Sequence, residues 1–223
     1  MLLIITIFLS IAASTAAFAP SGGFHQKTII SSSHKMGAEG GVDFGTLDGS
    51  KVRVGIIKTR WNKNHVDNLV SGARDALLKE CNVLESNIFE TEVPGAFELP
   101  MAAKLLAMSG AVDAIICCGV LIKGETMHFE YICDAVSNGI MNVGLQTSTP
   151  CIFGVLTCLN EEQVKDRSTG TNNHGLGWAK TAVEMSILRN EALGKAKKGL
   201  IGFSTGTPVG DGADVKKERV GFF

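Results

Sequence analysis

The chain has 223 residues, of which 45% are hydrophobic and 19% are charged, and its formal net charge is −1. This composition is typical of a globular protein rather than a disordered one. The length favours one domain with extensions over two full domains. There is no basic excess to drive nucleic-acid binding. Any anionic ligand must therefore be held by a few placed cations and backbone N–H groups.

The N-terminal segment differs in composition from the rest. Residues 2–19 form an apolar run that ends in small residues, and its length suits the core of a signal peptide. No basic residue precedes this run. After Pro20 the chain is rich in Ser, carries Lys27 and Lys35, and has no acidic residue before Glu39, which is the composition of a transit peptide.

This order of segments resembles the two-part plastid presequences of algae with secondary plastids, in which Phe18 would be the first residue after signal cleavage. We therefore expect residues 1–45 to be a targeting presequence, with residues 1–38 absent from the mature protein. The mature form is expected in the plastid stroma, without a membrane association. The alternative is an ordinary secretory signal on a secreted protein, although the chain has no Asn-x-Ser/Thr sequon.

Residues 46–193 alternate short β-rich runs with helical patterns and form the predicted domain. The expected strands are 52–58, 88–93, 112–119 and 151–157, nearly continuous in apolar or β-branched residues, as in a buried parallel sheet. The expected helices are 63–80, 126–146 and 173–193, with apolar residues at a 3.6-residue period. Asn62 or Asn64 can cap the first of them.

Strands separated by helices imply right-handed crossovers. The sequence therefore predicts an α/β fold: a three-layer, doubly wound sheet of about four parallel strands with helices on both faces. The remaining residues, 194–223, are rich in Gly with scattered charge and are expected to form a flexible tail.

The six cysteines are Cys81, Cys117, Cys118, Cys133, Cys151 and Cys158. They form no Cys-x-x-Cys pair, and no His lies at zinc-ligand spacing from two of them, so no metal site is predicted. We expect buried, reduced thiols that act as small hydrophobic side chains. Disulfide pairing is the alternative.

In a doubly wound sheet, ligands bind beyond the carboxyl ends of the strands. This rule directs attention to residues 59–62, 94–98, 119–128 and 153–157. In the first of these segments, Trp61 offers a flat face for stacking on a planar heterocycle. The alternative is an indole that packs between helices or subunits.

In the second segment, Pro94 and Gly95 predict a rigid turn in which the backbone can approach a ligand closely. Glu98 follows at a helix start, where a carboxylate is favoured and can accept hydrogen bonds from a polyol or an amine. The alternative is a carboxylate that only caps the helix.

In the third segment, residues 124–126 are expected to open a helix, whose free N–H groups would form an anion site. His128 would lie one turn into this helix, where it could transfer a proton. The alternative is an ordinary helix histidine. Arg167 and His174 flank a Gly/Asn loop and could either bind an anion or interact with helix ends.

Three segments together resemble the lumazine synthase family. They are Pro94-Gly95-Ala96-Phe97-Glu98-Leu99-Pro100, Gly124-Glu125-Thr126-Met127-His128-Phe129-Glu130-Tyr131 and Phe153-Gly154-Val155-Leu156-Thr157. The resemblance spans roughly residues 46–190 and implies a flavodoxin-like sheet. It also implies a transferase of riboflavin biosynthesis that joins 5-amino-6-(D-ribitylamino)uracil to 3,4-dihydroxy-2-butanone 4-phosphate, without cofactor or metal.

The resemblance also implies roles for particular residues. Trp61 would stack on the pyrimidine ring, and His128 would transfer protons. The backbone N–H groups of Glu125 and Thr126 would bind the phosphate, with Arg167 as its charged partner. The remaining substrate-binding residues would be Asn62, Ala96, Phe97, Glu98, Val120, Leu121, Ile122, Phe153 and His174.

Phe153, Arg167 and His174 would come from a neighbouring subunit, so the resemblance implies a homo-oligomer. In many relatives this is a homopentamer, and twelve pentamers form a 60-subunit shell. Three features depart from the family pattern: Trp61 replaces a common Phe, His174 replaces a common Lys, and the loop from Arg167 to Gly175 is short.

Two other classes of function remain to be compared. One is a non-catalytic riboflavin-binding or shell-forming protein on the same fold, which Trp61 alone would suit. The other is a flavodoxin-like electron carrier, which would need a Ser/Thr-rich phosphate loop after the first strand that the sequence lacks. A pure binder would have no use for His128, Arg167 and Glu98 together.

Overall fold

The structure is a computed structural model that describes residues 42–194. Nearly all of the predicted presequence and of the predicted C-terminal tail therefore lies outside the described residues. Within residues 42–194, no helix combines the length and apolar character that a membrane span requires.

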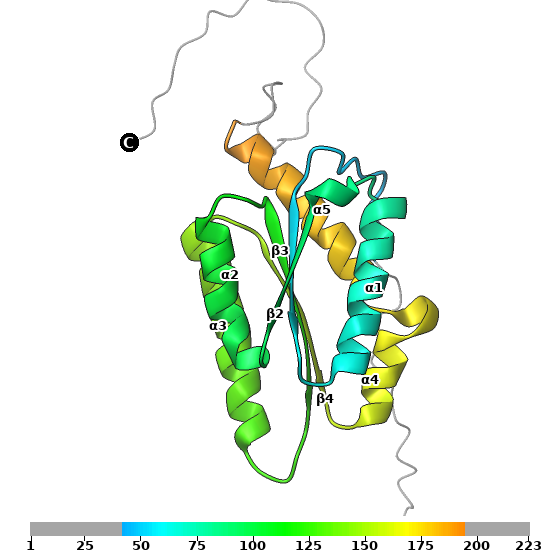
Figure 1. Cartoon of the computed structure of the whole chain (residues 1–223), viewed down its shortest axis with the longest axis vertical. Helices are drawn as coiled ribbons and strands as arrows, with labels where there is room; N and C mark the ends of the chain where they lie inside the picture. Colours follow the sequence, from blue (N-terminus) through cyan, green and yellow to red (C-terminus); the bar gives the residue numbers. More distant parts are fainter. Residues whose placement is uncertain (1–41, 195–223) are drawn as a thin grey trace, which may run out of the picture. The chain divides into compact units, whose positions relative to one another are not determined.

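Four parallel strands form one sheet, in the order β2-β1-β3-β4. The strands are β1 (Val54–Thr59), β2 (Ile88–Val93), β3 (Ala114–Ile122) and β4 (Cys151–Cys158). The helices are α1 (Lys63–Lys79), α2 (Leu99–Met108), α3 (His128–Thr147), α4 (Glu161–Ser168) and α5 (Gly175–Ala192), with 3-10 turns at Glu85–Asn87, Ala96–Glu98 and Gly170–Asn172. In Figure 1, α2 and α3 cover one face of the sheet, and α1, α4 and α5 cover the other. The predicted three-layer α/β fold is confirmed.

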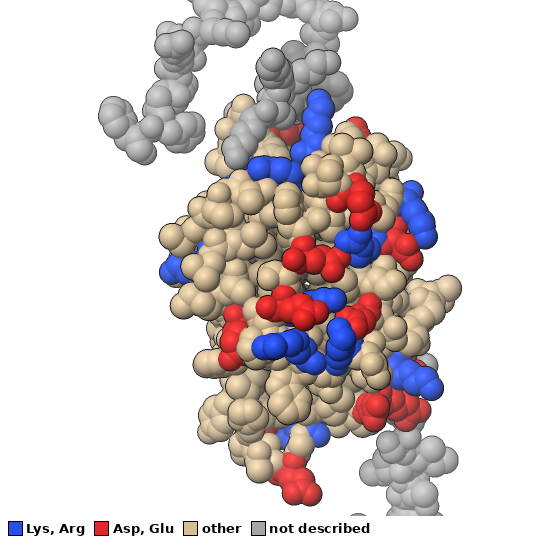
Figure 2. Space-filling view, in the orientation of Figure 1, with Lys and Arg blue, Asp and Glu red and all other residues tan. Residues whose placement is uncertain are grey.

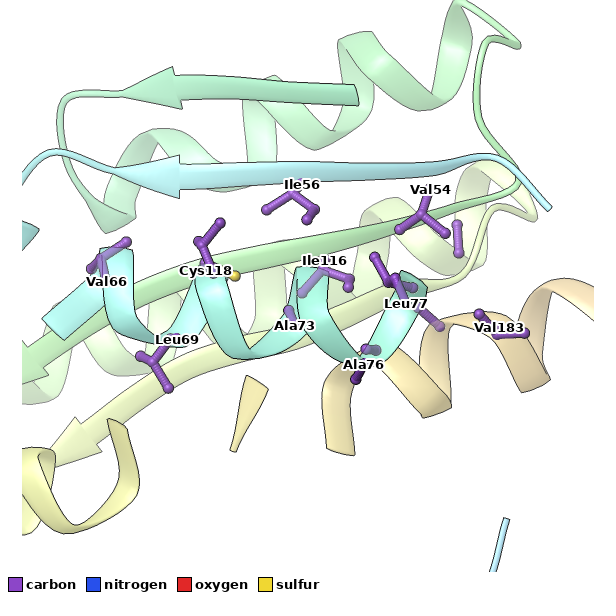
Figure 3. Packing of buried hydrophobic residues seen from close by; sticks show 14 of the residues in the cluster. Val54, Ile56, Val66, Leu69, Ala73, Ala76, Leu77, Ile116, Cys118 and Val183 are labelled. Atoms are coloured by element: carbon purple, nitrogen blue, oxygen red, sulfur yellow. The ribbon is translucent and has the colours of Figure 1, made fainter. Parts of the chain in front are cut away.

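Each face of the sheet has its own hydrophobic core. Val54, Ile56 and Ile116 point toward α1 and α5, as the close-up in Figure 3 shows. Ile57 and Ile115 belong to the second cluster, with residues of α2 and α3. Because successive strand side chains face opposite ways and both faces are covered, the central strands are mostly apolar, and Lys58 and Thr59 lie only at the end of β1.

All six cysteines are free, as predicted. Cys117 and Cys118 are fully buried in β3, whereas Cys133 and Cys151 are half-buried. Burial raises the pKa of Cys118 to about 12 and that of Cys151 to about 11. These thiols therefore stay protonated at neutral pH and act as small apolar side chains.

The sequence places the end of the third strand too early, at Gly119. In the structure β3 continues to Ile122, because β4 pairs with it as far as Ile122↔Cys158. Gly119 does not end the strand. A Cβ there would lie 3.3 Å from the Thr59 methyl group and 3.4 Å from Leu99, so its lack of a side chain serves close packing instead.

The predicted start of the next helix is also wrong. α3 begins at His128, so residues 124–126 form a loop and His128 is the first helical residue rather than one turn in. The residue before the helix, Met127, makes no side-chain cap. The sequence therefore carries no capping residue that marks this boundary.

The ranges of α2 and α4 are not predicted, although the expected helix start at Glu98 is confirmed by α2, whose N-cap residue is Glu98. α2 is apolar on both sides: Leu99 and Ala103 are buried, but Met101 and Leu105 are exposed. Its sequence therefore has no polar stripe to reveal a period. α4 has the opposite composition, with Val164 as its one buried apolar residue.

Gly175 allows α5 to approach α1 closely, so a larger residue at this position should destabilise the fold. A Cβ at this position would lie 2.1 Å from the carbonyl oxygen of Leu69 and 2.9 Å from the backbone nitrogen of Ala73. Gly175→Ala must push the two helices apart, and we expect it to destabilise the fold by about 1–3 kcal/mol. Thermal unfolding of the chain measures this.

Gly177→Ala in the same helix is the matched control, because nothing lies within 4 Å of its added Cβ. Alanine favours helix by about 1 kcal/mol over glycine, so this variant should be as stable as the parent or more stable. Equal unfolding midpoints for the two variants would contradict the close approach.

Candidate active site

The carboxyl edge of the sheet has a step, because its strands end at different heights. β1 and β2 end together at Thr59↔Val93, whereas β3 and β4 continue from Gly119↔Val155 to Ile122↔Cys158. The last pair of β1 with β3 is Lys58↔Cys118. Residues 120–122 therefore rise about 10 Å beyond the end of β1, at about 3.3 Å per residue.

A cleft of about 650 Å³ lies at this step. Its lining comes from the loop after β1, the turn after β2, the end of β3 and the start of α3. The lining residues are Trp61, Asn62, Gly95, Ala96, Phe97, Glu98, Val120, Leu121, Ile122, Gly124, Thr126, His128, Phe129 and Ile132. Three of the four segments expected at the ligand-binding edge meet here, namely 59–62, 94–98 and 119–128, whereas residues 153–157 do not line the cleft.

Asn62 fixes the loop after β1 to the end of β3. Its side-chain amide donates a 2.9 Å hydrogen bond to the carbonyl oxygen of Val120, which lies past the end of β1. Its backbone has φ 56°, in the left-handed region that Asn tolerates. Asn62 is the N-cap residue of α1, as predicted, but its side chain makes no capping hydrogen bond because its amide donates to Val120 instead.

Trp61 projects at the mouth of the cleft. Its side chain is 73% exposed, so within one chain most of the indole surface is uncovered. A Cβ at Gly95 would lie 3.4 Å from the indole Cδ1, which brings the turn after β2 into contact with the ring edge. An exposed indole beside a cleft can stack on a planar ligand.

The Glu98 side chain both caps a turn and faces the cleft. One carboxylate oxygen accepts a 2.9 Å hydrogen bond from the backbone N–H of Gly95, so Glu98 does cap the turn. The same side chain lines the cleft. A carboxylate has about four acceptor sites, which leaves several free for a ligand.

The loop between β3 and α3 joins the end of the sheet to the positive end of a helix. Gly124, Thr126 and His128 line the cleft, while Glu125 lies in the same loop but not on the cleft wall. The N-terminus of a helix attracts anions through its free N–H groups and its dipole. Lys123 forms an ion pair with Glu130, and its ammonium lies 5.8 Å from the Phe129 ring centroid.

Three of the predicted site residues do not line the cleft of their own chain: Phe153, Arg167 and His174. Phe153 is 39% exposed on the edge strand β4 and lines a separate apolar groove. Arg167 lies in the last turn of α4 and donates to the carbonyl oxygen of Gln163 at 2.9 Å. His174 precedes α5, and its backbone N–H donates to the carbonyl oxygen of Arg167 at 2.9 Å.

Burial, and secondly the positive charge of Arg167, lower the pKa of His174 below its ordinary value of 6.5. At neutral pH the His174 imidazole is therefore uncharged, unlike the Lys that the family pattern has there.

Two residues that line the cleft have no predicted part in binding: Phe129 and Ile132. Phe129 and Ile132 belong to the apolar stripe of α3, whose later members Val136, Ile140 and Val143 are buried in the core. The first turn of α3 extends past the sheet, so the start of the stripe faces the cleft.

The described residues contain no cluster of three or more His, Cys, Asp or Glu side chains placed to hold a metal ion. Acidic and basic side chains alternate on the face shown in Figure 2, so that face carries no large field of one sign. The cleft itself combines an apolar floor, an exposed aromatic ring, a carboxylate, a histidine and a helix N-terminus.

These features define a small-molecule enzyme of the doubly wound α/β class, with its cleft at the carboxyl edge of the sheet. Residues 51–190 match the family model of 6,7-dimethyl-8-ribityllumazine synthase, and the chain belongs to this family.

Individual relatives agree. The chain is 40% identical to the 6,7-dimethyl-8-ribityllumazine synthase of Pyricularia oryzae over 190 residues, which cover 67% of this chain and 94% of the relative. It is 44% identical to the Schizosaccharomyces pombe enzyme of that name over 143 residues, 63% of this chain and 90% of the relative. It is 48% identical to that of Cytophaga hutchinsonii over 132 residues, 59% of this chain and 82% of the relative.

The two contacts of Glu98 can be separated by substitution. Glu98→Ala removes the hydrogen bond to Gly95 and should cost about 0.5–2 kcal/mol of stability. Glu98→Gln retains a carbonyl oxygen that can accept this bond, so its unfolding midpoint should stay close to that of the parent. A loss of activity in Glu98→Gln would then report the carboxylate charge in the cleft. Equal destabilisation of both variants would show that the carboxylate, not an acceptor oxygen, holds the turn.

Proposed function

We propose that the chain condenses 5-amino-6-(D-ribitylamino)uracil with 3,4-dihydroxy-2-butanone 4-phosphate to give 6,7-dimethyl-8-ribityllumazine, phosphate and water. This is the reaction of the family to which the chain belongs. The observation that carries the proposal is the single cleft that joins Trp61, Glu98 and His128 from three separate segments. The direct test is turnover: the two substrates together should give the absorbance of the lumazine, and no product would contradict it.

The pyrimidine substrate suits the β1 and β2 side of the cleft. The exposed Trp61 indole can stack on its ring, over a floor formed by Val120, Leu121 and Ile122. Asn62, Ala96, Phe97 and Glu98 adjoin this space, and the free acceptor sites of Glu98 suit the hydroxyl groups of a ribityl chain.

The phosphate of the second substrate suits the loop that precedes α3. The backbone N–H groups of Glu125 and Thr126 lie just before the helix N-terminus, where an anion is favoured. Arg167 of a neighbouring subunit supplies the full positive charge in this proposal, with His174 beside it. Within one chain the nearest lysine of the loop, Lys123, is already paired with Glu130.

The reaction then proceeds in four steps. The primary amine of the pyrimidine attacks the ketone carbonyl, and loss of water gives an imine. Loss of the proton on the hydroxyl-bearing carbon expels phosphate from the adjacent carbon, with the phosphate charge held at the start of α3, and the remaining enol tautomerises to a ketone. The ribityl-bearing nitrogen attacks this ketone to close the second ring, and a second water is lost. Holding both reactants in one cleft and stabilising the departing phosphate supply most of the acceleration. His128 transfers protons at the cleft wall, a contribution typically worth about 10²–10⁴-fold.

A neighbouring copy completes the site in this proposal, and surface chemistry supports it. On α2, Met101, Leu105 and Met108 are each more than 60% exposed and share one face of the helix. The β4 edge carries an apolar groove of about 530 Å³, which includes Phe153. Exposed apolar patches of this kind mark protein interfaces. Contact between the α2 face of one copy and the groove of the next is heterologous and can close into a ring.

We infer that the ring is a homopentamer and the smallest active unit. Light scattering of the active enzyme should give the mass of five chains, or of twelve pentamers if rings assemble further. An active monomer would contradict the shared site.

We also infer import into a plastid, from the apolar run at residues 2–19 and the acid-free, Ser-rich segment after it. A fluorescent fusion of residues 1–45 should enter the plastid stroma. Secretion of the fusion, or its retention in the cytosol, would contradict this.

Arg167 and His128 should fail differently when each is replaced. Arg167→Ala removes a charge-assisted contact worth about 1.5–3 kcal/mol, so the KM for the butanone phosphate should rise about 10- to 100-fold. Arg167→Lys should recover only part of this, since its geometry differs. His128→Ala should lower kcat about 10–10³-fold with little change in KM. An unchanged kcat together with a destabilised fold would make His128 an ordinary helix histidine.

His174 should give the phosphate site a pH dependence. Its pKa lies below 6.5, so it is neutral at pH 7.5 and becomes charged as the pH falls. His174→Lys adds a permanent charge and should lower the KM for the butanone phosphate about 2- to 5-fold at pH 7.5. The advantage should shrink as the pH falls from 7.5 through the lowered pKa of His174 and the imidazole becomes protonated as well. A KM ratio that is constant across this pH range would count against the assignment.

A further inference from the structure

α4 carries Arg167 but has little to hold it in place. Its sequence is Glu-Glu-Gln-Val-Lys-Asp-Arg-Ser, and only Val164 and Ser168 are buried. A short helix without an apolar stripe depends on specific contacts for its position. The side-chain contacts between α4 and its neighbours therefore decide where Arg167 lies.

One side chain of α1, His65, contacts both ends of α4. Its Nδ1 lies 3.2 Å from the hydroxyl oxygen of Ser168 in the last turn. Its Nε2 lies 3.5 Å from a carboxylate oxygen of Glu161 in the first turn. The His65 side chain is only 19% exposed and Ser168 is fully buried, so the Ser168 end of the bridge is shielded from water, whereas the Glu161 end is exposed.

The bridge suits both protonation states of the imidazole. A neutral ring can donate from Nε2 to Glu161 and accept at Nδ1 from the Ser168 hydroxyl. A protonated ring can donate at both nitrogens, because a hydroxyl oxygen can also accept. Both states therefore hold the two ends of α4 to α1.

The same three residues resemble a Ser-His-Glu hydrolytic triad in composition, but the geometry does not allow that function. Ser168 has no exposed surface, so no substrate can reach its hydroxyl. None of the three lines the cleft. Their common effect is on the position of α4.

We propose that His65 is a positioning residue for the phosphate site. It fixes Ser168, the residue next to Arg167, and so holds the backbone from which Arg167 reaches the neighbouring subunit. The connection continues to the next element, since the Arg167 carbonyl oxygen accepts from the His174 backbone N–H at 2.9 Å. Asn173 also helps to hold the end of α4, because its side-chain amide donates to the Ser168 carbonyl oxygen at 3.3 Å. The inference rests on the proposed role of Arg167.

The test is steady-state kinetics on the full chain. His65→Ala removes the hydrogen bond to Ser168 and the contact with Glu161, and it should raise the KM for the butanone phosphate about 3- to 10-fold. The kcat and the KM for the pyrimidine should change less than about twofold. His65→Gln keeps one donor and one acceptor and should recover part of the loss. Asn64→Ala, an exposed position beside it on α1, is the control and should match the parent.

A second variant covers the case in which His65→Ala does not fold. Glu161 is 80% exposed, so Glu161→Ala leaves the core intact while it removes one end of the bridge. It should raise the same KM in the same direction, by a smaller factor. An unchanged KM in both His65→Gln and Glu161→Ala would overturn the proposal.

A double-mutant cycle with Arg167→Ala distinguishes a failure of the His65 proposal from a failure of the proposed role of Arg167. If His65 acts through Arg167, the KM of the double variant should equal that of Arg167→Ala alone. Multiplied effects in the double variant would show that His65 acts independently and would overturn the inference. An unchanged KM in Arg167→Ala would instead remove the proposed role of Arg167, whatever His65 does.

Discussion

The unequal length of the strands at one edge of the sheet is the constraint on which the site depends. β3 and β4 pair with each other as far as Ile122↔Cys158, beyond the point where β1 and β2 end. This leaves one side of β3 without a strand partner, and unpaired backbone groups away from water are costly. Asn62 meets part of this need by donating to the Val120 carbonyl oxygen. The rest of the step remains open as the cleft.

The step also explains why the sequence predicts the fold better than the boundaries of the site. The buried strands and the stripes of α1, α3 and α5 follow from hydrophobic period alone, and the predicted strand 88–93 coincides with β2. The end of β3 does not follow from it, because Gly119 has the composition of a strand end. Its position in the strand depends on pairing with β4 and on close packing at Thr59, both of which are tertiary contacts.

The residues of the site could likewise be predicted only in part from the sequence. The rule that parallel strands end at one edge is enough to bring Trp61, Glu98 and His128 together from the sequence. It does not reveal Phe129 and Ile132, whose stripe has the pattern of an ordinary core helix. The contacts of His65 with α4 could not be predicted either. A helix with one buried apolar residue has no hydrophobic period in its sequence, and the position of α4 decides which side chains contact His65.

A site shared between copies is the central claim, and subunit mixing tests it most directly. His128→Ala damages the cleft side of a site, and Arg167→Ala damages the side that a neighbour supplies. In mixed rings, a cleft from an Arg167→Ala chain beside a His128→Ala neighbour has both original residues. At a butanone phosphate concentration well below the KM of Arg167→Ala, where each separate variant is weak, equal mixing at random should therefore restore about a quarter of the parent activity. Activity no higher than the average of the two separate variants would contradict a shared site.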